Sequence, residues 1–346
     1  MENNRLIWAD SLKGWLMILV ILGHAIQAVL KEECYQSHLW NLIYSFHMPS
    51  FMAISGWLAF KIVNHKKTTH CVYGRSGGDF LNSCKRRFFQ LLIPYFVWSL
   101  VAYIMSWQYT IEKFAYIIIQ PDNYFWFLWV LFWIYVFFII VQWLSQIFKL
   151  SEIPLLAASG IFLILSMVIL DLRFFGFQFF AYYYLYYIIG YSLHKYEIKL
   201  SIVRKPIVIV SLTVAWVLMA WGWSMHELPL WLPQIPMIPT SLVQYAYRGL
   251  TALIAIVLLL GIAPIVLNGT RNLNKGIASV GKLSLGMYVG HSLFFGLLVR
   301  ILKFSCYNLP HYIYITTLFF LGSIISYIFI RMLTRNRLTS KFLLGK

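Results

Sequence analysis

The chain has 346 residues, of which 61% are hydrophobic and 11% are charged. Soluble globular domains carry about 25% charged residues, so this composition excludes a soluble domain and is typical of a polytopic membrane protein. The formal net charge of +17 does not indicate nucleic-acid binding, because the basic residues fall in short clusters between apolar runs, a distribution that encodes membrane topology.

The first apolar run follows Asp10 and carries Lys13 near its start and His24 in its distal half. No small-residue cleavage pattern follows it, so we interpret it as a retained membrane span rather than a signal peptide. Lys13 and His24 are eleven residues apart, which places them within roughly 20° of one helix face and ~16 Å apart along the axis. Burying an ionisable side chain in a membrane is costly, so His24 is a candidate functional residue.

Windows of ~20 apolar residues predict an all-α protein with about ten transmembrane helices, which we take as one domain over residues 1–346. The predicted spans are 12–30, 40–62, 88–107, 124–147, 154–171, 174–193, 206–223, 246–267, 283–302 and 312–332. If both termini are cytoplasmic, the inside segments hold most of the 28 Lys and Arg residues, as the positive-inside rule requires. The outside segments then hold only Lys31, Lys113, Arg173, Arg248, Arg300 and Lys303.

Acidic residues are scarce, and none lies in the middle of a predicted span. A carboxylate relay through the membrane is therefore hard to build, and histidine is the expected group for proton transfer at membrane depth. The eleven acidic residues are Glu2, Asp10, Glu32, Glu33, Asp79, Glu112, Asp122, Glu152, Asp171, Glu197 and Glu227.

Three of the nine histidines, His24, His47 and His291, lie within predicted spans. His24 and His47 fall at similar depth on consecutive spans, and His291 lies near the middle of the ninth. For each of them a structural hydrogen bond and a role in proton transfer are both open. Two interpretations are also open for Lys13: an anchor paired with Asp10, or an anion ligand that faces the same cavity as His24.

Other residue patterns are less specific. The basic cluster Lys85-Arg86-Arg87 at the foot of the third span is a topology signal that is also suited to phosphate binding. Trp126 and the tyrosine-rich run 182–187 fit interfacial belts and packing, or a wall that stacks on sugar rings. No metal or redox site is expected, because CxxC spacing is absent from the four cysteines, Cys34, Cys71, Cys84 and Cys306.

Five short segments form an ordered set along the chain. They are the basic residue and histidine Lys13 and His24; Phe46-His47-Met48-Pro49 followed by Ile54-Ser55-Gly56; Lys85-Arg86-Arg87 followed by Leu91-Leu92-Ile93-Pro94-Tyr95; Trp126-Phe127-Leu128; and Ser284-Leu285-Gly286-Met287-Tyr288 followed by His291. With these segments the chain resembles acyltransferase family 3, integral membrane acyltransferases that modify cell-surface glycans. Lys13 in place of the usual Arg is similar to the fucose 4-O-acetylase branch. The chain departs from the pattern at Gln90, where many members have a second Arg three residues after the first.

The resemblance implies an acyl donor, usually acetyl-CoA, supplied from the cytoplasm as a substrate and without a further cofactor. It implies an acceptor hydroxyl on a cell-surface glycan or its lipid-linked precursor, in a multi-pass protein of a bacterial inner or plasma membrane, in contact with membrane lipids. The implied catalytic residues are His24, as general base or acyl carrier, with Lys13, Asp10 and His47. The implied substrate-binding residues are Arg86, Arg87, Trp126, Ser55, Tyr288 and His291.

One alternative stays open on the residues alone. A transporter or flippase of a glycan precursor would line its pathway with the same polar groups and move no acyl group. The scarcity of carboxylates in the spans argues against proton coupling but does not argue against a passive flippase.

Overall fold

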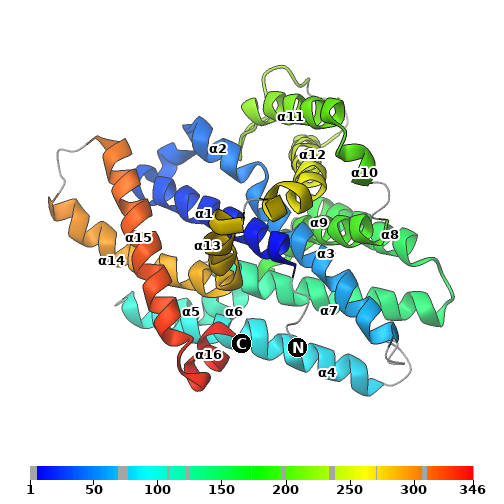
Figure 1. Cartoon of the computed structure of the whole chain (residues 1–346), viewed down its shortest axis with the longest axis horizontal. Helices are drawn as coiled ribbons and strands as arrows, with labels where there is room; N and C mark the ends of the chain where they lie inside the picture. The colour runs from blue at the N-terminus through cyan, green and yellow to red at the C-terminus, as the bar shows by residue number, and fades with distance from the viewer. Residues whose placement is uncertain are drawn as a thin grey trace. The chain divides into compact units, whose positions relative to one another are not determined.

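The computed structural model describes residues 6–68, 77–106, 110–121, 125–172, 174–196, 200–233, 238–269, 271–305 and 310–345. Within these ranges all regular structure is helical, which confirms the predicted all-α class (Figure 1). Some residues used in the sequence argument lie outside them, namely Glu2, Cys71, Asp122, Arg173, Glu197 and Cys306.

Within the described residues, seven helical segments are long and apolar enough to cross a membrane, as expected for a multi-pass membrane protein. Three further predicted spans are helical but are not among the seven. Helix α11 (Pro206–Trp221) is shorter, tyrosines lower the hydropathy of α9 (Phe177–Lys195), and the predicted span 40–62 is divided between two helices. The number ten and the cytoplasmic termini therefore stay predictions. The seven segments are Ile7–Gln36, Phe80–Met105, Trp126–Ile147, Glu152–Leu170, Thr240–Leu267, Ser284–Ile301 and His311–Leu333.

The chain divides into two compact units, each assembled from segments that are far apart in the sequence. Unit 1 comprises Met1–Ile54 and Tyr196–Ile330, and unit 2 comprises Ser55–Lys195 and Arg331–Lys346. Helices α3 (His47–Thr68) and α15 (His311–Leu333) each begin in unit 1 and end in unit 2. The single domain expected over residues 1–346 stays a prediction.

Unit 1 is organised around α1 (Ile7–Leu30), the helix of the first predicted span. Helix α1 contacts helices from both parts of the unit, and Figure 1 shows it crossing α13. Its neighbours are η1 (Lys31–Gln36), α2 (His38–Tyr44), α12 (Thr240–Gly269), α13 (Arg271–Lys282) and α14 (Ser284–Ser305). The short helix α10 (Leu200–Val203) and α11 pack against α12.

Glycines allow α1 and α13 to touch through their backbones. A Cβ atom at Gly14 would overlap the carbonyl of Ile277, and a Cβ atom at Gly281 would overlap the carbonyl of Asp10. Small residues at a crossing are the usual means by which membrane helices approach closely. The contact fixes the first turns of α1, which carry Asp10 and Lys13.

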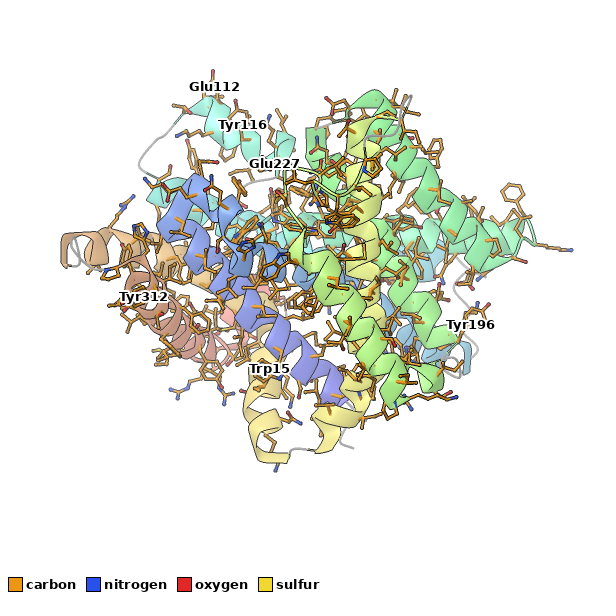
Figure 2. The ribbon with its side chains drawn as sticks, turned by 90° about the horizontal axis from the view of Figure 1, so that it is seen from above. Trp15, Glu112, Tyr116, Tyr196, Glu227 and Tyr312 are labelled. Carbon is orange, nitrogen blue, oxygen red and sulfur yellow. The ribbon has the colours of Figure 1, made fainter. Side chains whose placement is uncertain are left out.

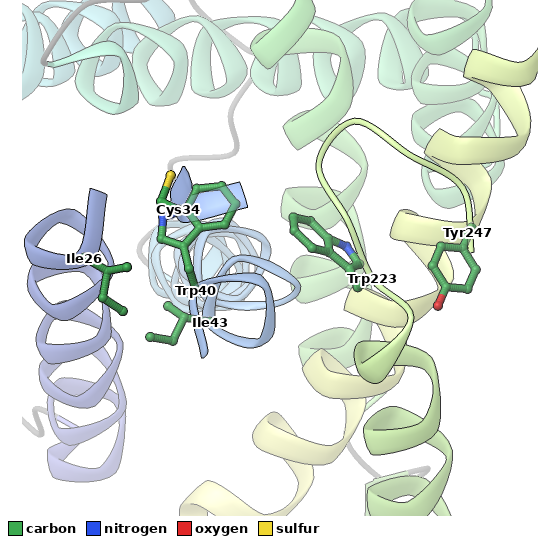
Figure 3. Packing of buried hydrophobic residues seen from close by; sticks show 6 residues of the cluster. All are labelled: Ile26, Cys34, Trp40, Ile43, Trp223 and Tyr247. Atoms are coloured by element: carbon green, nitrogen blue, oxygen red, sulfur yellow. The ribbon is translucent and has the colours of Figure 1, made fainter. Parts of the chain in front are cut away.

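The predicted second span is broken at Ser45 and Phe46, which form a turn between α2 and α3. The Ser45 hydroxyl donates to the carbonyl of Leu42 at 2.7 Å and so satisfies an acceptor at the end of α2. Sequence windows missed this break because both flanks are apolar. The turn lets α2 pack on the distal end of α1, where Ile26 points toward Trp40 and Ile43 (Figure 3).

Unit 2 contains one helical segment that changes its winding. Helix α4 (Gly77–Arg87) continues through one π-helical turn, η2 (Phe88–Leu92), into α5 (Ile93–Met105). The C-terminal helix α16 (Arg337–Leu344) packs on α5, and Trp98 Nε1 donates to the carbonyl of Leu343 at 2.8 Å. The other helices of the unit are α6 (Ile111–Ile119), α7 (Trp126–Ile147), α8 (Glu152–Leu170), η3 (Phe174–Gly176) and α9.

Candidate functional site

The foot of α1 carries an ion pair. Lys13 Nζ lies 2.8 Å from Asp10 Oδ1, one helical turn earlier. The carboxylate is 3% exposed and the lysine is half-buried, because the crossing with α13 covers this part of the helix. Ser11, between them, donates to the carbonyl of Asn274 on α13 at 3.3 Å. The predicted pairing of Lys13 with Asp10 is therefore present.

Two histidines from α1 and α14 are hydrogen-bonded to each other. His24 Nδ1 lies 2.7 Å from His291 Nε2, and the ring centroids are 4.9 Å apart. His291 Nδ1 lies 2.8 Å from the carbonyl oxygen of Met287, one turn earlier on α14. His291 is completely buried, whereas His24 is half-buried. The pair joins positions 267 residues apart in the sequence.

His47 lies at the start of α3 and is 2% exposed. Its Nδ1 donates to the carbonyl of Ile43 at 2.7 Å, a bond that bridges the break between α2 and α3. The ring of Tyr44 packs edge-on against His47 with centroids 4.6 Å apart. The same tyrosine lies against Gly23, where a Cβ atom would be 2.8 Å from the ring, and its hydroxyl donates to Gln27 at 3.2 Å. Tyr44 therefore links His47 to the turn of α1 that carries His24.

Tyr288 is the fourth predicted site residue at this depth of unit 1. It is 5% exposed and lies one turn before His291 on α14, with ring centroids 6.1 Å apart. The structure thus gathers His24, His47, His291 and Tyr288 around the distal half of α1. The Asp10–Lys13 pair lies at the other end of the same helix, ~16 Å along its axis from the 1.5 Å rise per residue.

An aromatic cluster covers the distal end of α1 in unit 1. Trp40 stacks on Tyr44 with centroids 3.7 Å apart, and Trp223 lies 6.5 Å from Trp40. The guanidinium of Arg248 lies 5.2 Å from the ring centre of Trp223, so a cation contacts this cluster. Arg248 was predicted from the sequence only to lie in an outside segment.

The predicted phosphate-binding residues belong to unit 2. Arg86 is exposed, and Arg87 is half-buried at the last turn before the π-helical segment. Arg87 Nη1 donates to Gln90 Oε1 at 3.2 Å, and its guanidinium lies 4.8 Å from the ring centre of Tyr135 on α7. Gln90, which replaces the second Arg of the family pattern, therefore acts as an acceptor that orients the first.

Two other predicted residues also belong to unit 2. Trp126, the first residue of α7, stacks on Phe179 and Tyr183 of α9 with centroids 4.6 and 5.1 Å away. Its ring is thereby engaged within the protein, as in the packing interpretation. Ser55 is half-buried on α3.

Sequence reasoning missed a polar cluster in unit 2 around Glu152. Glu152 Oε1 accepts from Gln142 Nε2 at 2.6 Å and from Tyr191 at 2.5 Å, and Oε2 accepts from Lys195 at 3.0 Å. The four side chains come from α7, α8 and α9. The one signal available in the sequence was an acidic residue directly at the start of an apolar run.

Comparisons with known proteins give one matching family and two relatives that share one name. The family described as "Acyltransferase domain" matches residues 6–332. The chain is similar to nodulation protein NolL of Sinorhizobium fredii, with 43% identity over 99 residues, 28% of this chain and 24% of that protein. It is also similar to nodulation protein NolL of Mesorhizobium japonicum, with 30% identity over 168 residues, 46% of this chain and 41% of that protein. The matches thus span less than half the length of these relatives. No solved structure matches the chain.

Proposed function

Because the chain belongs to the acyltransferase domain family, we propose that it is a membrane O-acyltransferase, and we propose its substrates and its base. The donor is acyl-CoA, with acetyl as the acyl group, supplied from the cytoplasm. The acceptor is a sugar hydroxyl of a cell-surface glycan or of its lipid-linked precursor, at a bacterial inner or plasma membrane. His24 takes the proton of that hydroxyl.

One observation carries the choice of His24: the direction of its hydrogen bond to His291. The Met287 carbonyl can only accept, so His291 Nδ1 carries the proton of that bond. In a neutral His291 the Nε2 atom is then an acceptor, and His24 Nδ1 must donate to it. The remaining nitrogen of a neutral His24, Nε2, holds a lone pair, and no described residue is bonded to it. A lone pair at a fixed position is what a general base requires.

Exposure separates His24 from the other two histidines. His291 is completely buried and His47 is 2% exposed, whereas His24 keeps part of its surface accessible. A base must come within hydrogen-bond distance of the proton that it removes. His24 therefore contacts the substrate in this proposal, and His291 acts as a positioning residue behind it.

The sugar oxygen attacks the thioester carbonyl carbon, the hydroxyl proton moves to His24 Nε2, a C–O bond forms and the C–S bond breaks. His24 then returns the proton to the thiolate of CoA. Transfer through an acyl-histidine would use the same Nε2 atom as nucleophile, so both routes require the same arrangement.

The other predicted residues keep supporting roles in the proposal. Arg87, held by Gln90, and its neighbour Arg86 are the cations of unit 2 that we assign to the phosphates of the donor, and Lys13 of unit 1, held by Asp10, is assigned as an anion ligand. Ser55, Tyr288 and Trp126 are assigned to substrate contacts. His47 supports the wall of the site through Tyr44.

The test uses membranes that contain the full chain, incubated with radiolabelled acetyl-CoA. Free CoA and label in the lipid-linked and glycan fractions are both measured. We expect His24→Gln to lower transfer by ~10²–10⁴-fold, the range for loss of a general base. The matched control is His311→Gln, an exposed histidine at the start of α15. Near-normal transfer by the His24 variant would contradict the proposal, and a flippase would release no CoA in any variant.

A further inference from the structure

Unit 2 contains a cavity of about 290 Å³ between the end of α5 and the short helix α6. This volume is at the lower end for small-molecule sites, so it suits a headgroup or one sugar ring rather than a nucleotide. Hydroxyl-bearing side chains and one lysine make up much of its lining, namely Tyr95, Ser99, Tyr103, Ser106, Lys113 and Tyr116.

Some of these polar groups are used within the protein. The hydroxyl of Tyr95 donates to the carbonyl of Ile117 and so ties α5 to α6. Tyr103 donates to the carbonyl of Thr110 at 3.4 Å, and Ser106 donates to the carbonyl of Tyr103 at 2.8 Å. These hydrogen bonds hold three of the side chains that line the cavity in place.

Three other side chains leave their polar atoms available. Within the described part of the chain, the Ser99 hydroxyl, the Tyr116 hydroxyl and the Lys113 ammonium have no hydrogen bond or ion pair. A cation and two hydroxyls that converge on one cavity match the oxygens of a phosphate or a phosphate-linked sugar.

The outer side of the same helix is apolar. Ile111, Phe114 and Ile118 of α6 are 89%, 52% and 47% exposed, and their spacing places them on one face of the helix. Leu100 and Ile104 of α5 are 45% and 51% exposed. In a membrane protein such a face lies in lipid. Figure 2 labels Glu112 and Tyr116 on this short helix.

We propose that the cavity binds the phosphate-bearing headgroup of a lipid, with Lys113 pairing with the phosphate and Ser99 and Tyr116 bonding to headgroup oxygens. The apolar face of α6 lies against the hydrocarbon tail. This chemistry has two sources, a bulk anionic phospholipid and a lipid-linked sugar. The second source rests on the proposed function, because it would make the cavity a site for the acceptor.

The test is native mass spectrometry of the full chain, released from nanodiscs without any acyl donor. The probes are phosphatidylglycerol, a polyprenyl-phosphate sugar, and phosphatidylcholine, whose headgroup is zwitterionic. We expect one anionic lipid retained per chain in preference to phosphatidylcholine, and an affinity lower by about 10–100-fold in Lys113→Gln, the range for loss of a charged hydrogen bond. Preference for the polyprenyl-phosphate sugar identifies an acceptor site, and preference for phosphatidylglycerol identifies a site for bulk lipid.

The matched control is Lys31→Gln, which removes another exposed lysine that does not line the cavity. Ser99→Ala, which removes one neutral hydroxyl of α5 from the cavity, should weaken retention of the anionic lipid by several-fold. Equal retention by the Lys113 and Lys31 variants, or equal retention of phosphatidylcholine, would overturn the proposal. His24→Gln should retain the lipid normally, so a failed binding test and a failed transfer test are distinguishable.

Discussion

Two of the polar clusters between the described helices, one in each unit, differ in whether the titratable group at their centre keeps an acceptor without a hydrogen bond. In unit 2 each carboxylate oxygen of Glu152 has a donor, and Lys195 neutralises its charge. In unit 1 the chain of hydrogen bonds runs from Met287 to His291 to His24 and ends at His24 Nε2, to which no described residue is hydrogen-bonded.

The difference separates a structural role from a chemical one. A carboxylate whose two oxygens both accept hydrogen bonds within the protein holds its helices together and has no oxygen left for a substrate. A network that stops at a lone pair on a half-buried ring keeps one acceptor for proton transfer. Both clusters use residues that are costly to bury, but only the histidine chain leaves an acceptor at an accessible position.

The largest expected effect tests whether His291 holds the ring of His24 in position. His291→Leu removes the acceptor for His24 Nδ1, so the His24 ring can rotate and change tautomer. We expect acyl transfer to fall by ~100-fold in kcat, the cost of misplacing a reacting group by about 1 Å. His291→Gln should recover part of the loss, because its side-chain oxygen can accept the same hydrogen bond.

Nitrogen-15 NMR of histidine-labelled protein supplies the readout that a purely structural role would not change. The His24 signals should report a proton on Nδ1 in the wild type and a mixture of tautomers in His291→Leu. An unchanged His24 tautomer in the leucine variant, or equal activity of the leucine and glutamine variants, would contradict the positioning role of His291.

The Glu152 carboxylate is expected to contribute to stability and not to acyl transfer. Glu152→Ala removes the acceptor of three donors and leaves Lys195 without its ion pair. We expect the free energy of unfolding to fall by about 2 kcal/mol, since bonds to charged groups contribute ~1.5–3 kcal/mol and the pair is partly exposed. Turnover per folded molecule should stay within about twofold, because both oxygens of Glu152 are occupied by donors within the protein.

Titration of the purified protein with a denaturing detergent measures the first quantity, and labelled acetyl-CoA measures the second. Loss of transfer without loss of stability would show that Glu152 takes part in acyl transfer. The distinction between a structural cluster in unit 2 and a catalytic one in unit 1 would then be wrong.

Local sequence patterns were sufficient for part of this comparison. Apolar windows located the helices, and the ionisable residues within them marked His24, His47 and His291 as candidates. The bond between His24 and His291 was not predictable, because it depends on how α1 and α14 pack across 267 residues of sequence. Helix α13 was missed because it is amphipathic and too short for a span window. Its contact with α1 depends on Gly14 and Gly281, whose spacing in one sequence carries no signal of contact.

The smallest expected effect tests whether the stabilisation by the Glu152 network is divided among its hydrogen bonds. Tyr191→Phe removes one donor to Oε1 and one of the two acceptors of Gln142 Nε2, while Gln142 still donates to Oε1 and Lys195 donates to Oε2. The aromatic ring is kept, so its edge-on packing against Phe138, with centroids 4.8 Å apart, is preserved. We therefore expect a loss of only ~1 kcal/mol in detergent unfolding, the typical net value of a hydrogen bond, because Gln142 Nε2 keeps Glu152 Oε1 as its acceptor. Gln142→Leu, which removes the other donor to the same oxygen, is the matched comparison. If either variant destabilises as much as Glu152→Ala, the network depends on that single bond, and the carboxylate would be as incompletely satisfied as the histidine chain.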